Sequence, residues 1–261
     1  MCGFWSNDPY TSLLKSFGYN AVRLPRADIK PLQVLSKNGG DASYFGELTT
    51  VFRPRDNNTS LPKSIDNTPA AKISEQKSDD LSIGLGLTIL GNVISAMGGS
   101  KLGLDSKYQQ AKAVSFQYQD VLQDKVEPAA LDKFLGQADV DPSSNTVANL
   151  LEADEVFIIT STIKSKKFTI YPKASRGSDT QVSIPEIQGI VGSNVQVSTQ
   201  SQDSSAITFE GPTPLVFGFQ AVQLYYDRDQ HFSLKPLKTK VAMRGKNRLL
   251  TDAPFVRLGG Y

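Results

Sequence analysis

The stretch from residue 81 to residue 97 fits two secondary structures, and this constrains the fold more than any other feature of the 261-residue chain. Apolar side chains stand at every second position at its start, with small or polar residues between them. The alternating apolar residues are Leu81, Ile83, Leu85, Leu87 and Ile89. This period and this length are those of one tilted membrane-spanning β-strand.

The same stretch also has apolar residues at helical spacing, namely Ile83, Leu87, Leu90, Ile94 and Met97. Its three glycines weaken such a helix by roughly 1 kcal/mol each relative to alanine. A buried core segment of a soluble protein therefore stays open as the alternative to a membrane strand.

Two further segments could complete hairpins. Val114, Phe116 and Tyr118 alternate with small or polar residues and form a second amphipathic strand that could pair with the first. Residues 156–171 and 194–209 form a second candidate pair of long, lightly polar strands. A single hairpin in a bilayer would leave backbone groups at its edges without hydrogen bonds, at several kcal/mol each. Since only a closed barrel removes these edges, any insertion must be oligomeric.

The rest of the chain predicts an α+β fold with a mostly antiparallel sheet. Asp8-Pro9, Glu127-Pro128 and Asp141-Pro142 each resemble the start of a helix. Strand-like runs cover residues 20–24, 32–35, 48–52, 156–163, 168–171, 194–199, 207–209 and 215–226. Residues 54–80 are polar and rich in Pro, Asn and Ser, which predicts a long loop.

Composition argues against several classes of function. Lys and Arg number 28 and Asp and Glu 26, so the formal charge of +2 gives no reason to expect nucleic-acid binding. One Cys and one His exclude an intrachain disulfide and a multi-Cys zinc site, and they leave little for catalysis. Patterns that imitate a phosphate loop and a calcium loop lack the required residues. The acidic Glu152, Asp154 and Glu155 fit a solvated turn better than paired catalytic carboxylates. We expect no enzyme, cofactor or metal.

Neither end of the chain resembles a targeting sequence. The first residues have no basic and apolar regions of a signal peptide, and no apolar run is long enough for a membrane helix, so a cytoplasmic chain is expected. Cys2 beside Gly3, Phe4 and Trp5 is a candidate for acylation, with a buried core Cys as the alternative. One acyl chain gives only marginal attachment, so a second membrane signal would be needed.

The carboxy-terminal region is first basic and then apolar. No acid interrupts the basic run from Ser233 to Thr251, which favours protease access and an anionic membrane surface. An ordinary solvated tail is the alternative. After it, Pro254, Phe255, Val256 and Leu258 suggest a short peptide docked onto the body. A peptide held in cis has an effective concentration on the order of millimolar, and this advantage ends when the linker is cut.

Long stretches of the chain resemble a bacterial gasdermin. They are GYNAVRLPRADIKPLQVLSKNG (18–39), SDDLSIGLGLTILGNVISAMGGSKLGLDSKYQQAK (78–112) and LLEADEVFIITSTIKSKKFTI (150–170), together with Cys2 and the basic-then-apolar tail. The resemblance implies an autoinhibited monomer in the cytoplasm, built on a twisted sheet with flanking helices. It implies that a separately encoded protease, caspase-like or other, removes a short inhibitory peptide. The body then forms homo-oligomeric β-barrel pores in the lipids of the inner membrane and kills the infected cell as anti-phage defence.

The resemblance also assigns roles to residues and regions of this chain. It implies palmitoylation of Cys2, a pore-forming domain over residues 1–243, a protease-sensitive linker over residues 244–250, and an inhibitory peptide over residues 251–261. Within the linker, the candidate cleavage residues are Arg244, Lys246, Arg248, Leu249 and Leu250. We expect residues 81–97 to be at least partly helical before cleavage and to pair as a strand with residues 111–120 afterwards. The rival interpretation is a soluble binding or scaffold module whose tail is an interaction peptide.

Overall fold

The structure is a computed structural model that describes residues 8–38, 41–74, 76–108, 111–140, 145–174, 183–200, 203–226 and 232–236. The helices in these ranges are α1 (Pro9–Ser16), α2 (Leu48–Val51), α3 (Ala71–Ser74), α4 (Ile83–Ala96), α5 (Leu104–Lys107), α6 (Pro128–Gly136), α7 (Asn145–Glu152) and α8 (Ile184–Val191). The strands are β1 (Asn20–Arg26), β2 (Gln33–Asn38), β3 (Asp41–Glu47), β4 (Phe52–Pro54), β5 (Ser64–Pro69), β6 (Leu81–Ser82), β7 (Ala111–Gln119), β8 (Leu122–Val126), β9 (Ala138–Val140), β10 (Val156–Ala174), β11 (Gln196–Gln200), β12 (Asp203–Tyr226) and β13 (Phe232–Pro236).

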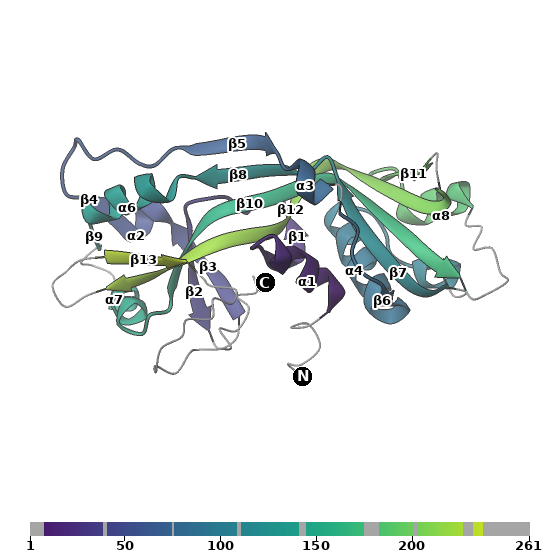
Figure 1. The fold of residues 1–261 in the computed structure, drawn as a ribbon, viewed down its shortest axis with the longest axis horizontal. Coiled ribbons are helices and arrows are strands. Elements are labelled where there is room, and N and C mark those ends of the chain that lie inside the picture. Colours follow the sequence, from purple (N-terminus) through teal and green to yellow (C-terminus); the bar gives the residue numbers. More distant parts are fainter. Residues whose placement is uncertain are drawn as a thin grey trace.

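Eleven of these strands form one antiparallel sheet, and β4 and β9 form a small second one. Helices flank the sheet, as Figure 1 shows. The predicted α+β class with a mostly antiparallel sheet is confirmed.

Two long central strands hold the sheet together. β10 has 19 residues and β12 has 24, and they pair with each other along almost their whole length. In Figure 1 they run from one end of the molecule to the other. The sequence predicted breaks near residues 164–167 and 210–214, but both strands continue there. The register between them shifts at residues 163–167, and such irregularities bend a strand without ending it.

These shifts divide the molecule into two halves. The half that we call the α4 half contains α4, α5, α8, β6, β7 and β11 with residues 167–174 of β10 and residues 203–210 of β12. At this point β10 changes neighbours, from β8 at Lys164 to β7 at Lys167. The largest core cluster fills mainly the α4 half, and a second cluster lies around α6 and α7. The largest cluster also reaches Tyr10 and Phe217 outside the α4 half, and a third cluster contains Val22 and Phe219. The two halves share the same two central strands.

Three details of the predicted secondary structure are wrong. Residues 48–51 are the helix α2, because Leu48 and Val51 lie three residues apart and are both buried. Residues 54–80 are not one long loop, since they contain β5, an edge strand with mostly exposed side chains, and α3. Residues 194–209 do not pair as one strand with residues 156–171. β11 lies on the far side of β12, and only residues 207–210 of this stretch pair with β10, opposite residues 167–170.

Two of the three helix starts predicted from proline residues can be compared with the structure. Asp8 caps α1, since its side chain accepts a hydrogen bond from the Thr11 backbone N–H at 2.8 Å, and α6 follows Glu127 as predicted. The third helix, α7, is described only from Asn145 onward, so the predicted start at Asp141-Pro142 lies outside the described residues. Val147 and Leu151 of α7 are buried, as their spacing predicted.

A partly buried ion pair lies where the two halves meet. The Lys164 side chain, 17% exposed, contacts the carboxylate of Asp124, which is 8% exposed. The other oxygen of Asp124 accepts a hydrogen bond from the Asn67 backbone N–H at 2.7 Å. Asp124 therefore connects β8 to both β10 and β5. Removing one partner of such a pair leaves the other charge buried without compensation.

We predict that Asp124→Ala lowers the free energy of unfolding by about 3 kcal/mol, the low end for breaking a buried pair. Asp80→Ala is the matched control, because Asp80 pairs with Lys173 at the surface, where such pairs contribute about 0–1 kcal/mol. Urea unfolding of both variants measures the difference. Equal losses would mean that the Asp124 pair is no more important than a surface pair.

Candidate functional site

Residues 81–97, whose sequence fits both a strand and a helix, are mainly helical in this structure, after a very short strand. Leu81 and Ser82 form β6, and α4 begins at the next residue. The expectation of a partly helical segment is confirmed. Of the helical stripe, Leu90, Ile94 and Met97 are buried, whereas Ile83 and Leu87 lie half-buried toward the start of α4. Helical packing therefore decides between the two patterns in this state.

A glycine allows α4 to lie close against β7. A Cβ added at Gly86 would lie 2.0 Å from Cγ2 of Val114 and 3.6 Å from Cζ of Phe116. By contrast, a Cβ at Gly84 would meet nothing within 4 Å. The two glycines look equivalent in the sequence, but only Gly86 is required by the contact between the helix and the strand.

The helix α4 packs on the apolar side chains of β7. Val114, Phe116 and Tyr118 are all buried in the main core, as a one-sided strand requires. The Tyr118 ring stacks on Phe217 at 3.6 Å between centroids, and its hydroxyl lies 2.9 Å from that of Tyr10 in α1. α1 and β7 are thereby linked across the core.

Charged residues collect at one border of the α4 half. Lys167 of β10 contacts Asp120 at 2.8 Å, and its ammonium lies 4.0 Å from Glu210 of β12. The hydrogen bond to Asp120 raises the pKa of Lys167. Beyond this border, four segments of the α4 half carry no charged residue: 81–100, 113–119, 168–172 and 204–209. Three of these segments belong to the neighbouring strands β7, β10 and β12.

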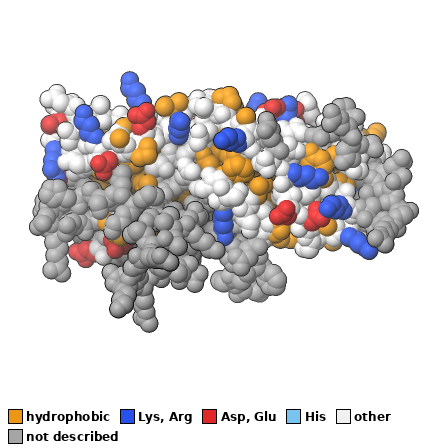
Figure 2. Space-filling model, in the orientation of Figure 1, with side chains coloured by type: hydrophobic (Ala, Val, Ile, Leu, Met, Phe, Trp, Pro, Cys, Tyr) orange, Lys and Arg blue, Asp and Glu red, His pale blue; other side chains and the backbone are white. Residues whose placement is uncertain are grey.

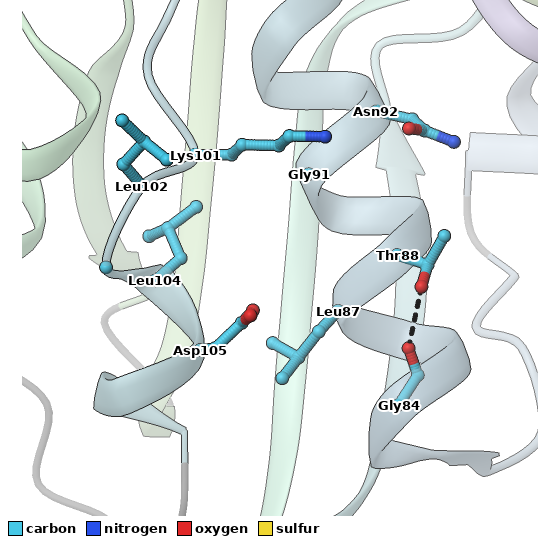
Figure 3. A pocket seen from close by; sticks show the side chains of 10 residues that line it. Gly84, Leu87, Thr88, Gly91, Asn92, Lys101, Leu102, Leu104 and Asp105 are labelled. Carbon is cyan, nitrogen blue, oxygen red and sulfur yellow. Dashed lines mark hydrogen bonds between the residues drawn. The ribbon is translucent and has the colours of Figure 1, made fainter.

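A half-open cavity of about 350 Å³ lies between α4 and the loop leading to α5. Figure 3 shows Leu87, Leu104 and Asp105 around it, and the Lys101 side chain reaching toward α4 near Gly91. Thr88 donates a hydrogen bond to the carbonyl of Gly84 at 2.9 Å, which is a contact within the helix. No local sequence pattern predicted this cavity, because its walls come from two segments whose packing is a tertiary feature. It contains no arrangement typical of a catalytic centre.

The surface of the described residues mixes apolar and charged side chains, as Figure 2 shows for one face. Leu102, beside the cavity, is 82% exposed and is the most exposed large apolar residue that the structure describes. Within the described ranges, no group of three or more His, Cys, Asp or Glu could hold a metal ion. None of the helices in those ranges has both the length and the apolar character to cross a membrane.

Several predicted site residues fall outside the described part of the chain. These are Cys2, the cleavage residues Arg244, Lys246, Arg248, Leu249 and Leu250, and the tail residues Pro254, Phe255, Val256 and Leu258. The structure brings the remaining predicted residues together, since Leu81, Ile83, Leu85, Leu87 and Ile89 belong to or pack against the same core as Val114, Phe116 and Tyr118. The acidic Glu152 and Asp154 are exposed at the turn before β10, which fits the predicted solvated turn.

The two glycines of α4 provide a matched test of this packing. We predict that Gly86→Ala lowers the free energy of unfolding by about 1–3 kcal/mol, because its methyl group has no room against Val114. Gly84→Ala should raise it by about 0.5–1 kcal/mol, because the site is open and alanine favours the helix. Thermal unfolding of both variants distinguishes them. The same response at both positions would contradict this close packing of α4 on β7.

The chain has close similarity to known proteins over nearly its whole length. Residues 22–231 match the model of the Bacterial Gasdermin Family. The chain is 52% identical over 265 residues to the gasdermin bGSDM of a Desulfuromonadales bacterium, covering 98% of this chain and 99% of that protein. It is 37% identical over 228 residues to the gasdermin bGSDM of Lysobacter enzymogenes, covering 87% and 84%.

The fold is also similar to that of a solved bacterial gasdermin from Bradyrhizobium tropiciagri. The TM-score is 0.63 over 89% of this chain and 92% of that one, and the sequences are 16% identical. This comparison supports the fold, and the family assignment rests on the closer sequences. The chain therefore belongs to the bacterial gasdermin family, a family of pore-forming proteins rather than enzymes.

Proposed function

We propose that this chain is an autoinhibited pore-forming protein of anti-phage defence. A protease encoded separately, caspase-like or other, cuts within residues 244–250 and releases the inhibitory peptide 251–261. The body, residues 1–243, then leaves the cytoplasm and assembles with further copies of itself into a large β-barrel pore in the inner membrane. Palmitoylation of Cys2 and the basic residues near the carboxy terminus supply the two membrane signals that stable attachment requires.

The observation that carries this proposal is the uncharged block in the α4 half. The side-by-side strands β7, β10 and β12 each have an uncharged segment there, and α4 adds residues 81–100. Charges at Asp120, Lys167 and Glu210 mark the border of this block. Charged side chains are costly on the lipid-facing side of a membrane strand, so such a block is the part of the sheet suited to the bilayer.

The conversion of α4 into a strand is compatible with the strength of its contacts. Its three glycines make it a poor helix in isolation, so packing on the sheet must stabilise it. Moving a two-state equilibrium from about 1:99 to 99:1 takes roughly 5.5 kcal/mol. A docked tail with several large apolar side chains, at about 1.5–3 kcal/mol each when fully buried, is of the required size. Loss of the tail can therefore decide which state is populated.

We predict that cleavage alone activates the protein. A full chain with the recognition site of a purified protease placed within residues 244–250 should leave dye-filled vesicles of bacterial polar lipids sealed. After cleavage the same protein should empty them, because the released peptide no longer stabilises the soluble state. Dye release with and without protease, together with electron microscopy of the vesicles, measures this. Equal release before and after cleavage would contradict autoinhibition. Cleaved protein that never causes leakage would support a soluble binding module instead.

We predict that two neighbouring residues of α4, Leu87 and Thr88, respond in opposite ways to replacement by arginine. In a strand, Leu87 faces lipid and Thr88 faces the water-filled lumen. Leu87→Arg should abolish dye release by the cleaved protein, because a lipid-facing Arg costs about 2–4 kcal/mol per subunit near the bilayer centre. Thr88→Arg should retain most of the release. Thr88 is exposed and Leu87 is half-buried at the cavity beside α4, so circular dichroism before cleavage must check that both variants fold. Full activity of Leu87→Arg would remove this segment from the barrel wall.

A further inference from the structure

The two residues of β6 already pair with β7 in a defined register. Leu81 lies opposite Val114, and Ser82 lies opposite Ala113. In an antiparallel ladder the two residue numbers of each pair have a constant sum, so these pairs fix the register of any extension. α4 begins at Ile83, immediately after this ladder.

We propose that this short ladder is the nucleus of a membrane hairpin, and that its register continues unchanged through α4 and α5 with the turn at Met97–Gly98. The inference rests on the proposed function, because it describes how the helix converts once the tail is released. Residues 81–96 would then lie opposite residues 99–114, sixteen on each side. This exceeds the roughly 9–11 residues that one tilted strand needs to cross a bilayer.

The alternation of apolar residues supports this register. It places Leu87 opposite Tyr108, Gly91 opposite Leu104, and Val93 opposite Leu102. Every odd-numbered residue of the first strand then shares a face with an even-numbered residue of the second. Within residues 99–114, the even positions Leu102, Leu104, Tyr108 and Val114 are apolar. The even positions Ser100, Ser106, Gln110 and Lys112 interrupt this face, with Lys112 opposite Ile83 near the end of the hairpin that β6 and β7 already form. A slip of one residue would set the apolar face of one strand against the polar face of the other.

The position of the turn agrees with the local sequence and backbone. The register puts the centre of the hairpin between Met97 and Gly98, and Gly99 follows. A two-residue type I′ turn, which matches the twist of the strands, requires a positive φ at both central residues. Glycine adopts one readily, and Met97, with φ −75° in this structure, would have to change its backbone conformation. Gly98 already has φ +82° in the soluble structure.

An existing ladder also removes the first obstacle to conversion. Forming a new strand pair from distant segments requires loop closure before any contact compensates its entropy. Here the first two pairs are in place, so each further pair adds next to a formed one. The conversion must open the cavity beside α4 and break the exposed contact between Lys107 of α5 and Glu186 of α8. Exposed pairs of this kind contribute little to stability.

Disulfide crosslinking on vesicles tests the register. Thr88→Cys with Lys107→Cys matches it, whereas Asn92→Cys with Lys107→Cys is displaced by four residues. Thr88 and Asn92 are one turn apart on α4 and both line the same cavity, so the helix presents them similarly. The full chain with the inserted protease site is cleaved on vesicles and treated with copper–phenanthroline in air. Peptide mapping by mass spectrometry then identifies each bond and separates it from any bond to Cys2.

We expect the 88–107 bond to form at least tenfold more in cleaved, membrane-bound protein than the 92–107 bond, and not to rise in uncleaved protein. Dye release with preferential formation of the 92–107 bond, or of neither bond, would overturn the register but leave pore formation intact. Absence of dye release by the parent protein would instead contradict the proposed function. If replacing Lys107 abolishes dye release, Gly84→Cys with Ala111→Cys tests the same register with small substitutions, against Thr88→Cys with Ala111→Cys. Failure of that pair to crosslink preferentially would also overturn the proposal.

Discussion

The close contact of α4 with β7 is the interaction on which the described fold depends. The helix covers Val114 and Phe116 only because residue 86 lacks a side chain, and the buried face of α4 supplies much of the main core. Without this cover, β7 would expose a continuous apolar face to water. The contact therefore stabilises the α4 half, and the proposed conversion of the segment into a strand would have to break it.

The proposed conversion would change one half of the molecule and leave the other half in place. β10 and β12 pass through both halves, but their register shifts and the charged residues around Lys167 and Asp124 lie at the junction. The core around α6 and α7 has its own set of buried side chains. Unfolding of α4 can thus remain local, since it removes contacts from one core and leaves the other intact.

The sequence predicted those elements whose signals are local. Asp8 and Glu127, each followed by proline, marked two helix starts correctly, and the apolar alternation of residues 114–118 marked β7. The strand β5 was missed because its side chains are mostly exposed and lack alternation. The continuity of β10 and β12 was missed because polar residues such as Lys166 and Lys167 resemble a turn, whereas pairing with neighbouring strands keeps the chain extended. The choice between helix and strand at residues 83–96 depends on tertiary packing, which no local pattern contains.

Residues 81–118 satisfy two structural requirements through different residues. The soluble helix requires glycine at position 86, and a strand with the register of β6 and β7 would accept a larger residue there. A strand requires apolar residues of matching parity at Leu102, Leu104 and Tyr108. In this structure Leu104 and Tyr108 are buried, but Leu102 is 82% exposed and has no evident role in packing. The helix thus accounts for Gly86 and the proposed hairpin for Leu102, so neither state alone explains the whole pattern.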